Sequence, residues 1–282
     1  LEKWILASFM GRINYDIADK YLFQATLRAD GSSRLAEGNK WQYFPGLSAG
    51  WRIIDEGFMA NADFLQELKL RASYGAVGNT SVDPYQTFGR LRRTTYAWDE
   101  SPAFGYGLAE IPNADLGWEV SSTFNLGADF GFFGGRLSGS FEWYTTNTED
   151  ILLERNLPPT SGYTNVLQNV ASSNTTGVEL GLTGVIVDNP EGLSWTTNFN
   201  FTSYDEEIVE LALVDENGVP QDDPGNGWFI GQPLKVFFEY EKVGIWQLGE
   251  EDMARDMEQK FPGEIRLKDQ DGDGRISPDD SI

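Results

Sequence analysis

Residues 21–30 read YLFQATLRAD, and apolar and polar side chains alternate along this stretch. The odd-numbered positions from Tyr21 to Ala29 are apolar, whereas most even-numbered positions from Leu22 to Asp30 are polar. Successive side chains of a β-strand point to opposite faces of the sheet, so the pattern predicts a strand with one apolar and one largely polar face. Ten residues are also long for a strand of a soluble sandwich, where the average is ~5–6.

The same alternation recurs in seven other segments, which gives eight predicted strands in all. Helical periodicity is scarce, so the chain is predicted to be all-β and antiparallel. A soluble sandwich also alternates, with its polar face in water, and the pattern alone leaves that alternative open. The other segments are residues 9–16, 47–53, 68–74, 124–130, 137–143, 178–183 and 195–202.

The connections between these segments favour a transmembrane β-barrel. Short turns at one end of a sheet and long loops at the other are typical of outer-membrane barrels, whose strands hide apolar residues at every second position. Aromatic residues also cluster near the strand ends, where a barrel meets the membrane interfaces. The short connections are residues 17–20, 133–135 and 188–192, and the long ones lie near 31–43, 78–115, 145–173 and 205–228. An intermediate connection, residues 55–67, is predicted to contain a helical turn at 58–60.

The composition excludes several classes of function. The chain has 44 Asp+Glu against 21 Lys+Arg, a net charge of −23 that repels phosphate backbones, so no nucleic-acid partner is expected. It has no Cys and no His, which excludes a thiol nucleophile, a Ser-His-Asp triad and a thiolate zinc site. The paired carboxylates Glu206/Glu207 and Asp222/Asp223 are interpreted as solvated loop charges. No catalytic residue is therefore predicted, and the chain is not expected to be an enzyme.

One motif near the end of the chain predicts a metal site. Residues 269–280 read DQDGDGRISPDD and match the twelve-residue calcium loop, in which oxygen ligands and a sharp glycine turn recur at fixed positions. Residues 264–267 are predicted to be extended and Pro278 interrupts an exiting helix, so the loop is free-standing rather than part of an EF-hand domain. The alternative is a solvated acidic turn. The predicted Ca²⁺ ligands are Asp269, Asp271, Asp273, the backbone carbonyl of Arg275, and Asp280.

Aromatic residues in the long loops are the second candidate site. Their rings can stack on a sugar ring or a peptide of a ligand, or can pack the loops against each other. The residues chosen for ligand binding are Tyr85, Trp98, Tyr106 and Tyr163.

Several stretches resemble the SusC/RagA family of TonB-linked outer-membrane transporters. The similar segments follow the family's order along nearly the whole chain. They are residues 9–16, 20–34, 43–53, 68–75, 78–79, 176–180, 230–234, 243–247 and 262–274.

The resemblance implies a large barrel of ~22 strands closed by an N-terminal plug, in the outer membrane of a Gram-negative bacterium and in contact with its lipid. Such transporters import an oligosaccharide or a peptide together with a SusD-like surface lipoprotein, and TonB drives the import through a region absent from this chain. The chain begins with Leu1 and shows no signal peptide, TonB box or plug, so it is expected to be a fragment of the barrel. Residues 1–204 are predicted to hold the strands, and residues 205–282 an extracellular region that carries the calcium-like loop.

The distribution of charge supports this division. Residues 205–282 hold 21 Asp+Glu and 7 Lys+Arg and carry −14 of the net −23, so the first 204 residues carry only −9. The competing hypothesis is a secreted acidic β-rich adhesin or carbohydrate-binding protein stabilised by calcium. The two hypotheses differ in location, since only the transporter is embedded in a membrane.

Overall fold

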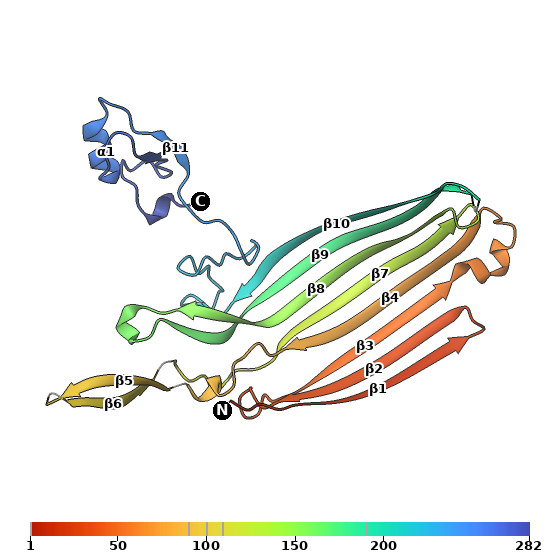
Figure 1. The fold of residues 1–282 in the computed structure, drawn as a ribbon, viewed down its shortest axis with the longest axis horizontal. Coiled ribbons are helices and arrows are strands. Elements are labelled where there is room, and N and C mark those ends of the chain that lie inside the picture. The colour runs from red at the N-terminus through yellow and green to blue at the C-terminus, as the bar shows by residue number, and fades with distance from the viewer. Residues whose placement is uncertain (1, 90, 100, 109, 190) are drawn as a thin grey trace. The chain divides into compact units, whose positions relative to one another are not determined.

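A computed structural model describes residues 2–89, 91–99, 101–108, 110–189 and 191–282. The chain forms two compact units, Leu1–Leu234 and Lys235–Ile282. The larger unit is an antiparallel sheet with the strand order β1-β2-β3-β4-β7-β8-β9-β10 (Figure 1). Each of the eight predicted segments lies in one of these strands, except that Ile53 of the segment 47–53 begins the short 3-10 helix η1 (Ile53–Asp55), and this confirms the all-β prediction. The strands are β1 (Leu6–Ile17), β2 (Tyr21–Ser32), β3 (Trp41–Arg52), β4 (Leu65–Asn79), β7 (Glu119–Phe132), β8 (Leu137–Asn156), β9 (Asn165–Asp188) and β10 (Ser194–Leu211).

Two of the three predicted short connections, 17–20 and 133–135, form tight turns, while the third, 188–192, includes Pro190, which lies outside the described residues. Ala18 and Asp19 join β1 to β2 with φ of 54° and 57°, and Phe133, Gly134 and Gly135 join β7 to β8 with φ between 57° and 82°. Such left-handed backbone is the conformation that two-residue and three-residue hairpin turns require, and glycine adopts it without steric cost. The predicted helical turn is also present, as the short 3-10 helix η2 (Gly57–Met59).

Three of the predicted long loops contain more strand than expected. The prediction that residues 145–173 form a loop was wrong, because β8 and β9 continue to pair as far as Asn156 opposite Asn165. β10 likewise runs seven residues past the predicted boundary at 204, and its last part pairs with residues 171–176 of β9. The extensions lack strict alternation because polar residues occupy both faces, mainly Thr, Ser and Asn in β8 and β9 and Asp and Glu in β10. The loop at 78–115 contains a separate hairpin, β5 (Leu91–Trp98) with β6 (Ser101–Leu108).

Two small apolar cores hold the connections at the loop end of the sheet in place. In the first, the rings of Phe44 and Trp118 meet edge-on with centroids 5.4 Å apart, and Leu116 is fully buried. The second lies where β8, β9 and β10 extend beyond their neighbours. The first core consists of Leu35, Phe44, Val82, Leu116 and Trp118, and the second of Ile151, Ala171, Ile208 and Leu211.

The smaller unit is built around Trp246, which is 1% exposed. Strand β11 (Lys242–Ile245) pairs with β12 (Ile265–Leu267). The pairing of β12 confirms the prediction that the segment 264–267 is extended. The helix α1 (Glu251–Glu258) supplies the carboxylate of Glu258, which accepts hydrogen bonds from Trp246 Nε1 at 3.2 Å and the Leu267 N–H at 2.8 Å. Among the described residues, no helix has the length and hydropathy needed to cross a bilayer.

Candidate functional site: a two-faced sheet and a carboxylate loop

One face of the eight-stranded sheet is apolar across its full width. Residues directly opposite each other in an antiparallel pair share a face, so the register of the strands identifies each side-chain row. Large apolar side chains on this face are exposed, with Ile13 at 72% and Phe9 at 69%. Such a continuous apolar surface marks an interface with a membrane or another protein. One row of this face runs Ile17, Tyr21, Trp51, Leu70, Ala128, Phe141, Leu180 and Phe201.

The apolar face has the height of a bilayer core. On β2 it extends from Tyr21 to Ala29, which is eight steps of ~3.4 Å or ~27 Å along the strand. A tilted strand needs ~9–11 residues to cross the apolar band of an outer-membrane barrel, so nine residues suffice. Stacked aromatic pairs mark both ends: Tyr21 lies against Trp51 at 6.3 Å between ring centroids, and Phe9 lies against Trp41 at 6.1 Å. These pairs occupy the positions of the two interfacial aromatic girdles.

Glu56, in the connection after β3, links the aromatic pair Tyr21 and Trp51 at the end of the sheet that carries the short turns. Its carboxylate accepts hydrogen bonds from Tyr21 Oη at 2.7 Å, Trp51 Nε1 at 3.1 Å and Lys20 Nζ at 3.2 Å. The hydrogen bond from Tyr21, followed by those from Trp51 and Lys20, lowers the pKa of Glu56 below its usual value. The ionised carboxylate therefore links β2, β3 and their turns.

We expect Glu56→Gln to remove a pH-dependent part of the stability. Because the folded-state pKa of Glu56 is lowered, its contribution is present above the unfolded-state pKa of ~4.3 and is lost as the pH falls through the folded-state value. In thermal unfolding of the full-length protein in detergent, wild type should have a higher melting temperature than Glu56→Gln at neutral pH, and the difference should become smaller in acid. Asp55→Asn, which breaks the exposed pair with Arg52, is the control. A wild-type advantage that does not change with pH would contradict the prediction.

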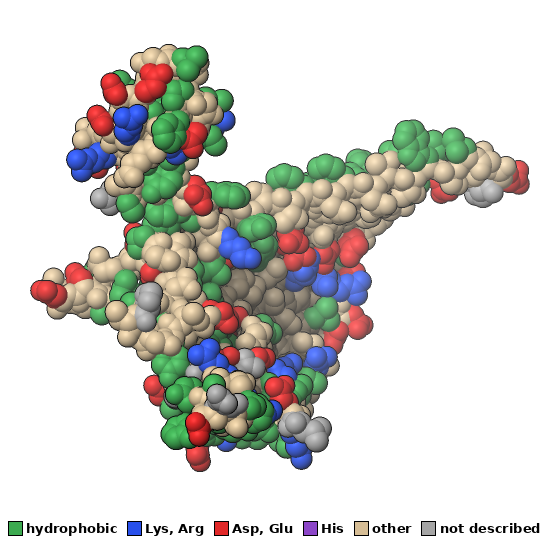
Figure 2. All heavy atoms as spheres, turned by 60° about the vertical axis from the view of Figure 1, so that its left-hand side comes forward, with side chains coloured by type: hydrophobic (Ala, Val, Ile, Leu, Met, Phe, Trp, Pro, Cys, Tyr) green, Lys and Arg blue, Asp and Glu red, His purple; other side chains and the backbone are tan. Residues whose placement is uncertain are grey.

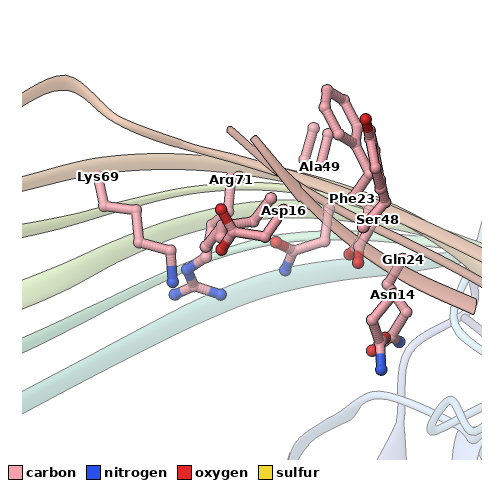
Figure 3. A pocket seen from close by; sticks show the side chains of 14 residues that line it. Asn14, Asp16, Phe23, Gln24, Ser48, Ala49, Lys69 and Arg71 are labelled. Carbon is pink, nitrogen blue, oxygen red and sulfur yellow. The ribbon is translucent and has the colours of Figure 1, made fainter. Parts of the chain in front are cut away.

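The opposite face is polar and hollowed, with acidic and basic side chains gathered inside it (Figure 2). A pocket of about 460 Å³ lies on this part of the sheet, and Figure 3 shows Lys69, Arg71 and Asn14 on one side of the strands and Phe23 on the other. The polar side chains that line the pocket include Asn14, Asp16, Gln24, Ser48, Lys69 and Arg71.

The charges of this face neutralise one another across three strands. Arg71 of β4 lies 3.2 Å from Asp129 of β7 and 2.6 Å from Glu142 of β8. Lys69 lies 3.7 Å from the same Asp129, and Asn125 Nδ2 donates to Glu142 at 2.9 Å. A polar interior beside an apolar exterior is the arrangement of a barrel that encloses water.

Next to these charges runs an uncharged row. Each member pairs directly with the next, so all side chains of the row point to the polar face. Amides and hydroxyls dominate it, and two tyrosines stand at one end. The row consists of Asn14, Gln24, Ser48, Ser73, Asn125, Tyr144, Gly177 and Tyr204.

The predicted calcium loop brings three of its acidic residues together. One carboxylate oxygen from each of Asp269, Asp271 and Asp273 lies within 4.8 Å of the others. The Asp273 N–H lowers the pKa of Asp271, but desolvation, the charges of Asp273 and Asp280 and a side-chain hydrogen bond with Asp269 outweigh it, so that the pKa of Asp271 is raised. This mutual repulsion is what a bound cation relieves.

The other two predicted ligands take different positions. Asp280 is fully buried and accepts from the Gln270 and Ser277 N–H groups, each at 2.7 Å, so it closes the base of the loop and is not in the three-carboxylate group. The N–H of Arg275 donates to Asp273 Oδ1 at 2.8 Å. The loop leaves the strand after Lys268, whose N–H donates to Glu241, and returns at Ser281 beside Tyr240.

The predicted aromatic ligand residues do not form one surface. Trp98 pairs with Ser101 and Tyr106 pairs with Arg93, which places the two rings on opposite faces of the β5–β6 hairpin. Tyr85 is 49% exposed and has a left-handed backbone with φ of 69°, while Tyr163 is half-buried in the connection between β8 and β9. Their role in binding stays a prediction.

Fold and site together define a section of the wall of an outer-membrane β-barrel. Residues 6–246 match the family described as "TonB dependent receptor-like, beta-barrel". The chain belongs to the TonB-dependent receptor family, within its SusC/RagA-like members, and such proteins reside in the outer membrane of Gram-negative bacteria. This confirms the family and location expected from the sequence.

Individual relatives show how much of the protein the chain represents. It is 34% identical to TonB-dependent receptor P26 of Formosa agariphila over 98% of this chain and 28% of that protein. It is 32% identical to SusC of Bacteroides thetaiotaomicron over 75% of this chain and 22% of that protein. The RagAB peptide importer in its closed-closed state superposes with a TM-score of 0.77 and 28% identity, over 98% and 30% of the two chains. The chain thus spans less than a third of these relatives.

Proposed function

We propose that the chain is a late section of the wall of an importer that carries an oligosaccharide or a peptide across the outer membrane. The observation that carries the proposal is the two-faced sheet, whose apolar face extends ~27 Å along β2 while its other face is polar and hollowed. The strands β1 and β10 stand at the two open edges of this sheet, where further strands of the barrel continue it.

The partners follow from the same proposal. A SusD-like surface lipoprotein covers the loop end, and TonB supplies the driving force through a segment outside this chain. The superposition on RagAB, described as a peptide importer, supports an import role. Residues 205–282, with their net charge of −14, lie outside the cell. No bond is made or broken in this function, in keeping with a family of receptors and transporters.

Fractionation and uptake test the proposal together. The full-length protein should be recovered in the outer-membrane fraction, and its deletion should abolish TonB-dependent uptake of a labelled oligosaccharide or peptide pool. Recovery only in the soluble or secreted fraction would overturn it and favour the acidic adhesin instead.

We also propose that Asp269, Asp271 and Asp273 hold a Ca²⁺ ion, with the Arg275 carbonyl and Asp280 completing or supporting the loop. Support comes from the twelve-residue spacing and from the three carboxylates gathered within 4.8 Å.

Calorimetric titration of the full-length protein should give a saturable Ca²⁺ signal that Asp271→Ala abolishes. Asp256→Ala, which removes an exposed carboxylate of α1, is the matched control and should leave the signal unchanged. The absence of any heat at millimolar Ca²⁺, or equal heats in wild type and Asp271→Ala, would remove the calcium proposal.

A further inference from the structure

Two tyrosines flank a glycine on the polar face of the sheet. Tyr144 of β8 and Tyr204 of β10 both pair directly with Gly177 of β9, so the three residues share one face. A Cβ atom at Gly177 would lie 2.6 Å from Cζ and Oη of Tyr144, which means that the tyrosine ring lies over the glycine backbone. Gly177 is buried beneath it, and the neighbouring Tyr204 is 65% exposed. We call these three residues, Tyr144, Gly177 and Tyr204, the aromatic platform.

The platform stands at the outer boundary of the apolar band. On the apolar face, Trp143 is followed by Thr145, and Phe201 is followed by Ser203 and Asp205. The change from apolar to polar side chains marks where the strands leave the hydrocarbon. The platform lies on the polar face at this height.

Groups that both donate and accept hydrogen bonds surround the platform. Asn125 is paired with Tyr144, and Ser73 with Asn125, while the hydroxyls of Thr123 and Thr146 lie 2.9 Å apart one position further out. These amides and hydroxyls match the hydroxyl groups of a sugar, which also donate and accept.

The charges near the platform disfavour an anionic ligand. The carboxylate of Glu142, two residues from Tyr144, is held by Arg71 at 2.6 Å and Asn125 at 2.9 Å, so it is not free to pair with a cationic side chain. Glu179 and Glu206 lie two residues from Gly177 and Tyr204 on the same face, and they repel anionic cargo while accepting hydroxyl hydrogen bonds.

We propose that the platform is a stacking subsite for an uncharged sugar ring of the cargo. The C–H face of the sugar packs on the exposed ring face, and its hydroxyls bond to the amide, hydroxyl and carboxylate groups around it. The inference rests on the proposed import function and narrows its cargo from an oligosaccharide or a peptide to a neutral oligosaccharide.

Binding by the purified full-length protein tests the subsite, with a panel of neutral oligosaccharides and a panel of peptides of matched length as probes. We expect at least one neutral oligosaccharide to bind, with affinity about tenfold weaker in Tyr144→Ala and nearly unchanged in Tyr144→Phe. Gly177→Ala displaces the ring without removing it and should weaken binding in the same direction. Tyr74→Ala removes a tyrosine from the apolar face of β4 and is the matched control.

Three results would overturn the subsite: binding of peptides but of no neutral oligosaccharide, no binding from either panel, or equal affinity in wild type, Tyr144→Ala and Gly177→Ala. Heat-modifiable gel migration establishes that each variant has folded. Fractionation and peptide uptake by the same strains separate the two proposals. A protein in the outer membrane that imports only peptides remains an importer without this subsite, whereas a protein absent from that membrane fails both.

Discussion

Replacing Leu180 with Arg is expected to destabilise the barrel by about 1–3 kcal/mol, between the values for the interface and the midplane. Leu180 lies on the apolar face of β9, between Phe141 and Phe201 on the neighbouring strands. A guanidinium at this depth has no water and no counter-charge within the apolar face, so its desolvation is not compensated. Equilibrium unfolding of the full-length protein in lipid vesicles measures the change, and the amount of assembled protein in the outer membrane should fall with it.

Thr202→Arg is the matched control for Leu180→Arg. Thr202 is adjacent to Phe201 on β10, but it points to the polar face and is paired with Glu179. An arginine there reaches water and a carboxylate, so its effect should stay within about 0.5 kcal/mol. Equal destabilisation by the two substitutions would mean that the two faces of the sheet do not differ in environment.

Replacing Leu116 with Ala is expected to cost about 2–5 kcal/mol in the first apolar core. Leu116 is fully buried, and its carbonyl accepts a hydrogen bond from the Ala36 N–H at 3.1 Å, so this residue joins the loop after β2 to the loop before β7. The cavity left by the substitution should release both loops while the strands stay paired.

Limited proteolysis of intact cells that display the full-length protein measures this release. Leu116→Ala should be cut faster in the loops near residues 33–40 and 110–118 than wild type, with the same outer-membrane abundance. Leu91→Ala truncates a leucine that is 65% exposed and should be cut at the wild-type rate. Equal loop cleavage in Leu116→Ala and wild type would show that this core does not hold the loops.

The strands were predictable because the bilayer imposes a strict pattern. Where one face meets hydrocarbon and the other meets water, apolar residues must fall at every second position, as they do from Tyr21 to Ala29. Beyond the bilayer both faces contact water, and polar residues on both faces replace the alternation, mainly Thr, Asn and Ser in β8 and β9 and Asp and Glu in β10. For this reason the outer halves of β8, β9 and β10 were expected to be loops although they are strands.

The candidate sites were predictable only where their residues are close in sequence. Asp269, Asp271 and Asp273 of the carboxylate loop stand at alternate positions of one short segment, so their spacing in the sequence predicted that their carboxylates lie close together. The ion pair of Arg71 with Glu142 and the platform of Tyr144 on Gly177 depend on strand register. Because the β5–β6 hairpin intervenes between β4 and β7, the partner of β4 could not be inferred from the sequence.

Spin-label accessibility along β9 tests the two-faced wall most directly. Single cysteines are introduced into the full-length protein at Glu179, Leu180, Gly181 and Leu182, labelled, and exposed in lipid vesicles to oxygen and to a water-soluble nickel complex. We expect oxygen to reach Leu180 and Leu182 preferentially, and the nickel complex to favour Glu179 and Gly181, which gives a period of two residues. Equal accessibility at the four positions, or contact of Leu180 and Leu182 with the nickel complex alone, would contradict a membrane-spanning wall.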